Sequence, residues 1–181
     1  MSEKSTNKYA IVDLEATSAS STACIIQVGI VIMQNGRVID EFASDVNPHQ
    51  KLDNHIVHLT GITDQQLSQA PDFSEIARTI FELIEDCIFV AHNVKFDANL
   101  LAEALFMEGF ELRTPRVDTV ELAQVFYPTL EQYNLSYLSR VLNLDFAQAH
   151  TAIEDARATG KLLLHLMDKI ASLPRQTIEM L

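Results

Sequence analysis

The sequence predicts an α/β protein with a mixed sheet flanked by helices, and two patterns support this class. Near the N-terminus, three apolar segments at residues 9–12, 25–33 and 37–42 have the composition of strands. Beyond them, segments with helical spacing alternate with short apolar runs as far as residue 170. Consecutive strands followed by such alternation favour one sheet with helices packed against it.

The first three strands are expected to form an antiparallel meander. Residues 9–12 are apolar on both faces, which suits a central strand. Asn35-Gly36 separates the second and third segments and is a strong hairpin signal. A short helix is expected in the stretch "DNHIVHLTGIT", with its end at Gly61.

The later helices are predicted from apolar positions three and four residues apart. Short buried strands are expected between them, at residues 88–91 and around Val117. Gly109 suits the C-cap of one helix, and Pro128 stops another. The predicted helices cover residues 72–85, 95–108, 119–126, 135–142 and 151–170.

The length of 181 residues predicts a single domain over residues 1–181 with a sizeable core. We place that core at about residues 8–171. The tail at 172–181 turns apolar again at its end. This suggests a domain cut from a longer chain, with the tail as the start of a linker to a further domain.

Composition excludes several classes of protein. With 13 Lys and Arg against 25 Asp and Glu, the net charge is −12, so an avid binder of duplex nucleic acid is not expected. No apolar run approaches the length of a membrane span, and the polar N-terminus is no secretory signal. Cys24 and Cys87 lack zinc-site spacing, so we expect no zinc and interpret them as reduced thiols of a cytoplasmic protein rather than a structural disulfide.

The segment "KYAIVDLEATSAS" poses an electrostatic problem. Asp13 and Glu15 alternate with Leu14, so in a strand both carboxylates point to one face. Two like charges roughly 5 Å apart, at an effective dielectric constant of about 20, repel by about 3 kcal/mol. A divalent cation between them would relieve this repulsion, and binding such ions would also reverse the local charge.

Two further segments supply acids that could share such an ion. Asp97 lies in the first turn of a predicted helix, where the helix dipole alone could explain it. Asp155 lies on the apolar side of the last helix, five residues after His150, which by itself suits a capping or surface position. Together, four acids and a histidine fit a two-metal phosphoryl-transfer site, with the histidine able to accept a proton near neutral pH.

Three motifs, "VDLEAT", "VAHNVKFDANLL" and "HTAIEDA", resemble the exonuclease motifs of the DnaQ-like 3′→5′ exonucleases of the DEDDh group. This group includes the proofreading exonucleases of bacterial replicative polymerases and the exonuclease domains of DinG-type helicases. The resemblance covers residues 9–166 and implies a ribonuclease-H-like fold with a five-stranded mixed sheet.

The resemblance also implies roles for individual residues. Two Mg²⁺ or Mn²⁺ ions would be held by Asp13, Glu15, Asp97 and Asp155, and His150 would be the general base. The residues implied in substrate binding are Leu14, Ala16, Thr17, Leu59, Asn93 and Phe96. Thr151 stands where the family often has Arg, which removes a phosphate contact but no metal ligand.

The expected function is a metal-dependent 3′–5′ exonuclease that releases 5′-mononucleotides from the 3′ end of single-stranded or frayed DNA, in replication or repair. Tethering to a polymerase or helicase would supply effective concentration in place of affinity. One alternative is an exoribonuclease of the same family, similar to oligoribonuclease or ribonuclease T. A non-catalytic docking module and a phosphatase with an aspartyl nucleophile are further alternatives.

Structural roles are expected for the remaining candidates. His92 follows a strand and suits a hydrogen-bonded structural histidine, while Asp118 suits a helix cap. The other expectations place Tyr133, Leu135, Phe81, Phe89 and Phe106 in packed positions and His55 and His58 at the surface.

Overall fold

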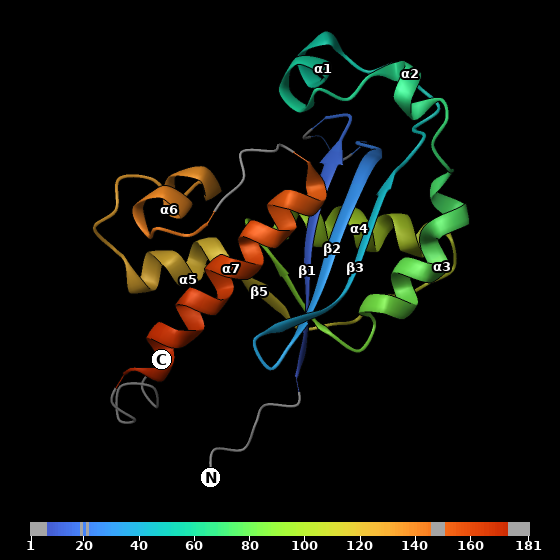
Figure 1. The fold of residues 1–181 in the computed structure, drawn as a ribbon. Helices are drawn as coiled ribbons and strands as arrows, with labels where there is room; N and C mark the ends of the chain where they lie inside the picture. Colours follow the sequence, from blue (N-terminus) through green and yellow to red (C-terminus); the bar gives the residue numbers. More distant parts are fainter. Residues whose placement is uncertain (1–6, 19, 21, 146–150, 174–181) are drawn as a thin grey trace.

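The computed structural model describes residues 7–18, 20, 22–145 and 151–173, and a single mixed sheet lies at its centre (Figure 1). The strand order is β3-β2-β1-β4-β5. β1 pairs with β2 in antiparallel and with β4 in parallel orientation, as the predicted meander and alternation require. The strands are β1 (Lys8–Ala16), β2 (Ile25–Gln34), β3 (Arg37–Asp45), β4 (Ile88–Ala91) and β5 (Arg116–Asp118).

Helices cover both faces of the sheet (Figure 1). They are α1 (Asn54–Thr60), α2 (Asp64–Leu67), α3 (Phe73–Ile84), α4 (Val94–Met107), α5 (Thr119–Phe126), α6 (Leu135–Val141) and α7 (Ala152–Ala171). On one face, α3 and α4 pack on a large core that includes Val12 and Leu14 of β1. On the other, α7 packs on Ile11, and α5 and α6 pack in turn against α7. The mixed five-stranded sheet flanked by helices is therefore confirmed.

Two local features differ from the sequence predictions. β1 continues four residues past the expected end at Val12, because Asp13 to Ala16 pair with β2 in register up to a bulge at Glu15/Ala16. The carboxylates therefore lie within the strand and not after it. The four-residue helix α2 was not predicted; Thr63 caps it by accepting a hydrogen bond from the backbone N–H of Gln66.

The expectation that Phe106 belongs to the core is wrong, since its exposed fraction is 66%. The buried face of α4 passes through Ala98, Leu101 and Leu105, and the residue after Leu105 is rotated by about 100° away from that face. Phe89 is buried and Phe81 stacks on Phe110, as expected. Among the residues that the structure describes, no helix combines the length and apolar character of a membrane span.

Candidate active site

β1 presents two carboxylates to the face covered by α7. Side chains alternate along the strand, so Asp13 and Glu15 share a face with Ile11, which packs on α7. Both carboxylates are only partly buried, because they lie beyond the apolar part of this helix–sheet interface. The strand therefore aims both acids at the N-terminal turns of α7.

A glycine allows α7 to approach them. Gly29 of β2 pairs directly with Asp13, and a Cβ atom added to Gly29 would lie 2.2 Å from the backbone carbon of Ala152. The helix backbone therefore rests on the sheet backbone at this point. Asp155, one turn later, then reaches the β1 acids: one carboxylate oxygen from each of Asp13, Glu15 and Asp155 lies within 4.8 Å of the others.

Asp97, on α4, adjoins this group of three acids. It lies in the first turn of α4, is 6% exposed, and accepts a hydrogen bond of 3.0 Å from the backbone N–H of Leu14. That bond attaches α4 to β1 between the two acidic residues. The charge of Asp97 also acts on the other acids. It contributes to the raised pKa of Asp13, and the charge of Glu15 contributes to the raised pKa of Asp97.

The pKa values show that the acids repel one another. Burial, then the charges of Asp97, Asp155 and Glu15, raise the pKa of Asp13 well above its usual value. Burial and Asp155 raise the pKa of Glu15 to about 7. Burial raises the pKa of Asp97 to about 7, although the Leu14 N–H opposes this shift. Concentrated carboxylates of this kind are stabilised by a cation.

The donor set fits a hard divalent ion. Among the described residues, the cluster offers carboxylate oxygens only. Mg²⁺ and Mn²⁺ prefer such oxygen ligands, whereas thiolate and imidazole sets favour zinc. The structure brings Asp13, Glu15 and Asp155 together, and Asp97 adjoins this group through its hydrogen bond to the Leu14 N–H. His150 lies outside the described residues, and Thr151 after it caps α7 by accepting from the N–H of Glu154.

A cavity of about 370 Å³ adjoins Glu15. It is lined by five of the six residues expected to bind substrate, namely Leu14, Ala16, Thr17, Leu59 and Phe96. Leu59 projects from α1 with an exposed fraction of 62%. The hydroxyl of Thr17 already accepts one hydrogen bond within the protein, from the N–H of Cys24.

Asn93, the sixth residue, lines a neighbouring cavity of about 480 Å³ together with Lys95 and Asn99. Phe96 lines both cavities and so lies between them. Asn93 adopts a left-handed backbone conformation as the N-cap of α4. Asn93 therefore shares a cavity with Phe96 but not with Leu14, Ala16, Thr17 or Leu59.

The expected structural roles of Asp118 and His92 are confirmed. Asp118 accepts hydrogen bonds from the backbone N–H groups of Asn93, Val94 and Val120, so one carboxylate holds the starts of both α4 and α5. His92 contacts the Thr119 hydroxyl and the Tyr133 carbonyl through its two ring nitrogens, and burial lowers its pKa. Tyr133 and Leu135 pack as expected, and His55 and His58 are exposed.

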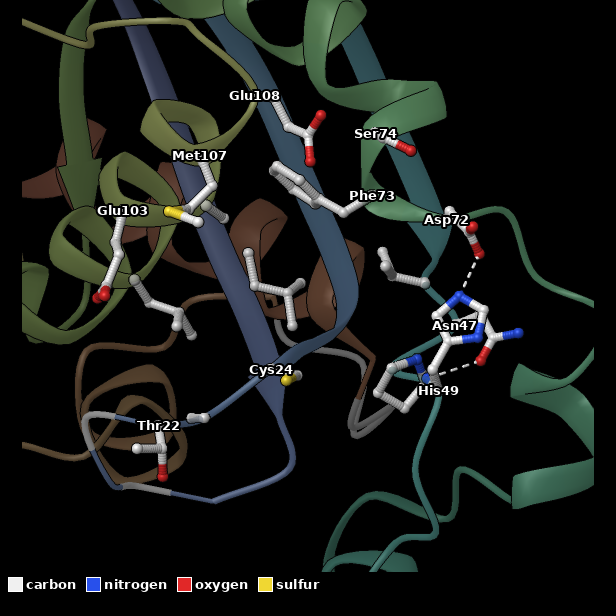
Figure 2. A pocket seen from close by; sticks show the side chains of 16 residues that line it. Thr22, Cys24, Asn47, His49, Asp72, Phe73, Ser74, Glu103, Met107 and Glu108 are labelled. Atoms are coloured by element: carbon white, nitrogen blue, oxygen red, sulfur yellow. Dashed lines mark hydrogen bonds and ion pairs between the residues drawn. The ribbon is translucent and has the colours of Figure 1, made fainter.

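A further cavity, of about 570 Å³, lies between α3, α4 and the start of β2 (Figure 2). Its lining includes Cys24, Met107 and Glu103, and His49 pairs with Asp72 at its rim. None of the four clustered acids lines it. The smaller cavity beside Glu15 is therefore the candidate active site.

Sequence reasoning missed the residues that bring α7 onto the sheet. Gly29, Gln27 and Asp45 were not singled out, although an isolated glycine within the apolar run "IIQVGIVIM" is a signal of close backbone approach. That signal shows where a neighbour comes near but not which segment it is. The identity of the neighbour, residues 152–153, required the structure.

Sequence comparison finds relatives of this chain among exonucleases. The model of the RNase_T exonuclease family matches residues 10–163. The 3′-5′ exonuclease DinG of Staphylococcus aureus (strain USA300) is 38% identical over 175 residues, which are 96% of this chain and 20% of the relative. The chain thus spans 20% of the length of the curated relatives it matches.

Solved structures share the fold at low sequence identity. The nuclease domain of 3′hExo, a DEDDh family member solved with rAMP, superposes with a TM-score of 0.79 at 16% identity, over 96% of this chain and 98% of that one. Exonuclease X, solved with 5′ overhanging duplex DNA, gives 0.73 at 19% identity, over 94% and 98%. The solved structures show the fold, and the family model establishes that the chain belongs to the RNase_T exonuclease family.

Proposed function

We propose that this chain is a divalent-metal-dependent 3′–5′ exonuclease that hydrolyses the terminal phosphodiester of DNA and releases 5′-mononucleotides. The observation that carries the proposal is the cluster of Asp13, Glu15 and Asp155, with ligand atoms within 4.8 Å, beside a cavity of nucleotide size. Family membership supports the reaction class, and the position of the cavity supports cleavage at a chain end.

The four carboxylates would hold two Mg²⁺ or Mn²⁺ ions. When bound, the ions would activate a water molecule and neutralise charge that develops on the phosphodiester oxygens. The chain's own contribution is to fix the ligands on rigid elements. Asp13 and Glu15 lie on the central strand, and Asp97 is attached to that strand through Leu14.

His150 is the proposed general base. An imidazole with an ordinary pKa near 6.5 can accept a proton from water at neutral pH. The residue directly precedes Thr151, the N-cap of the helix that carries Asp155. The proposal for His150 rests on this place in the sequence and on the family motif.

The terminal nucleotide would occupy the cavity beside Glu15. Leu14, Ala16 and Thr17 form the β1 side of this cavity, and Leu59 of α1 lies opposite as an exposed apolar side chain able to press on the terminal base. Phe96 lies where the chain would pass towards the neighbouring cavity. Asn93, in that second cavity, would contact the chain before its last nucleotide.

Tethering to a polymerase or helicase would compensate for weak binding. The net charge of −12 disfavours long-range attraction of nucleic acid. The Staphylococcus relatives are about five times longer than the aligned segment, since it covers 20% of them. We therefore propose a role in DNA replication or repair as one domain of a larger assembly, in the cytoplasm, where the free thiols Cys24 and Cys87 would persist.

RNA is the second candidate substrate, because one structural neighbour was solved with rAMP. A single experiment separates the candidates. Matched 5′-labelled and 3′-labelled DNA and RNA oligonucleotides are incubated with the protein and Mg²⁺ or Mn²⁺, and the products are sized. We expect a descending ladder from 5′-labelled DNA and immediate release of a labelled mononucleotide from 3′-labelled DNA.

The variant Asp13→Asn serves as the control for contaminating nucleases. Faster degradation of RNA would replace the DNA assignment with the second candidate. Degradation from the 5′ end, or cleavage that persists unchanged in Asp13→Asn, would overturn the proposal. A protein that neither binds Mn²⁺ nor cleaves would instead be a docking module.

A further inference from the structure

One transverse row of the sheet links three strands on the face covered by α7. Gln27 of β2 lies directly opposite Glu15 of β1 on one side and Asp45 of β3 on the other. In the next row on the same face, Asp13 lies opposite Gly29, the position where the backbone of α7 touches the sheet. Gln27 thus lies beside both the acidic pair and the helix start.

The Gln27 side chain uses both ends of its amide. Its Oε1 accepts a hydrogen bond of 2.8 Å from the backbone N–H of Ala152, the first residue of α7. Its Nε2 donates at 2.8 Å to Oδ1 of Asp45. The other oxygen of Asp45 accepts at 2.7 Å from Nε2 of Gln66 in α2. A helix N–H is therefore connected through an amide and a carboxylate to a second amide.

This chain of hydrogen bonds supplies a directional constraint at the start of α7. The first N–H groups of a helix have no partner within the helix, so each needs one from outside. Apolar packing of α7 on Ile11 and Val31 is non-directional, and it leaves small shifts of the first turn inexpensive. The bidentate ion pair of Arg157 with Glu41 also joins α7 to β3, but it is partly exposed and lies five residues after Ala152, so it does not hold the first N–H groups of the helix.

We propose that Gln27, held by Asp45, is a positioning residue for the acidic cluster. It fixes the first turn of α7 against β2, so that Asp155 meets Asp13 and Glu15 at the distance the site needs. The inference rests on the proposed function for its catalytic consequence. The predicted effect of Gln27 on Mn²⁺ affinity can be measured without turnover, so the positioning role and the proposed function can fail separately.

A reciprocal exchange of side chains tests the hydrogen-bond chain. Gln27→Glu keeps the acceptor for Ala152 but sets the introduced carboxylate against that of Asp45. Adding Asp45→Asn restores every bond, because the amide introduced at position 45 donates to the carboxylate at position 27 and its oxygen accepts from Gln66. The double variant has the wild-type net charge. It still carries the carboxylate introduced at position 27, opposite Glu15. A recovery of kcat or Mn²⁺ affinity therefore cannot come from removal of that charge.

The experiment measures kcat and KM on 5′-labelled single-stranded DNA, Mn²⁺ affinity by calorimetry, and Tm. For Gln27→Glu we expect a fall in kcat and in Mn²⁺ affinity of about 10- to 100-fold, the range for partners that orient metal ligands. KM should change by less than about threefold, because the nucleotide cavity is formed by β1, α1 and α4. In the double variant, kcat and Mn²⁺ affinity should be at least about tenfold higher than in Gln27→Glu.

Gln65→Glu is the matched control. Gln65 is an exposed residue of α2 beside Gln66, and its substitution adds the same charge outside the hydrogen-bond chain. We expect it to match the wild type in all four quantities. Wild-type kcat and Mn²⁺ affinity in Gln27→Glu, or a double variant no better than Gln27→Glu, would overturn the inference. A wild-type protein that binds Mn²⁺ but does not cleave would overturn the proposed function, while the affinity series would still test Gln27.

Discussion

The contact between Gly29 and α7 can be tested by adding a single methyl group. In Gly29→Ala, the new Cβ would lie 2.2 Å from the carbon, 2.3 Å from the nitrogen of the next residue and 2.4 Å from the oxygen of the Ala152–Ile153 peptide. All three atoms belong to the backbone, so no side-chain rotation can remove the overlap. Either the first turn of α7 moves away from β2, or β2 bends.

The size of the effect follows from the geometry. Cβ atoms essentially never lie closer than 3.0 Å to such an atom, and ordinary contacts begin at 3.4 Å, so the helix start and β2 must separate by about 0.8 to 1.2 Å. Forcing a methyl group into a packed interface typically costs about 1–3 kcal/mol. For a chain of this length, that loss lowers Tm by about 3–10 °C. Asp155 moves with its helix, and a 1 Å misplacement at a reacting centre can reduce turnover about 100-fold.

The assay combines thermal unfolding with turnover of 5′-labelled single-stranded DNA. Gly160→Ala is the matched control, because it adds the same methyl group to the same interface. There the nearest atom is the flexible Met33 sulfur at 3.0 Å, and alanine favours a helix by up to about 1 kcal/mol over glycine. We expect Gly160→Ala to keep wild-type turnover and an equal or higher Tm. If Gly29→Ala behaved like Gly160→Ala, the argument that close backbone contact places Asp155 would be refuted.

Three further outcomes follow from the acidic cluster. Asp13→Asn should reduce Mn²⁺ affinity and turnover by orders of magnitude and raise the Tm of the metal-free protein, because it removes a partly buried charge that its neighbours repel. An unchanged turnover would contradict its assignment as a ligand. The metal-free protein should lose stability as pH rises from 4.5 to about 7, because the folded chain holds a proton on Glu15 that the unfolded chain has released. Mn²⁺ should raise Tm more at pH 8 than at pH 5. Thermal unfolding measured across this range, with and without Mn²⁺, would contradict the prediction if either trend had the opposite sign. His150→Ala should bind Mn²⁺ normally but lose turnover most near neutral pH, and an identical pH–rate profile would exclude a base role.

Strand and helix patterns in the sequence were sufficient for the architecture. The Asn35-Gly36 turn produced the β2–β3 hairpin, and helical spacing located α3, α4 and α7 to within two residues at each end. These features depend on residues close together in the chain, whose side-chain directions follow from the period of the element. The same reasoning correctly placed Asp13 and Glu15 on one face.

Errors arose where a neighbour distant in sequence decides the outcome. β1 continues through its two acids because backbone hydrogen bonds pair it with β2 as far as Ala16. Phe106 is exposed because the sheet lies beneath Leu105. Periodicity alone does not say which face of a helix meets the sheet.

By itself, the sequence determined which residues carry the chemistry: four acids at the ends of core elements, within three motifs in the family order. Only the tertiary structure decided that they converge, because residues 13 and 155 meet where Gly29 offers no side chain and Gln27 offers a hydrogen bond to Ala152. Local periodicity sets the direction of a side chain. The distance between two segments about 140 residues apart is set by backbone contact and directional bonds, which no local pattern records.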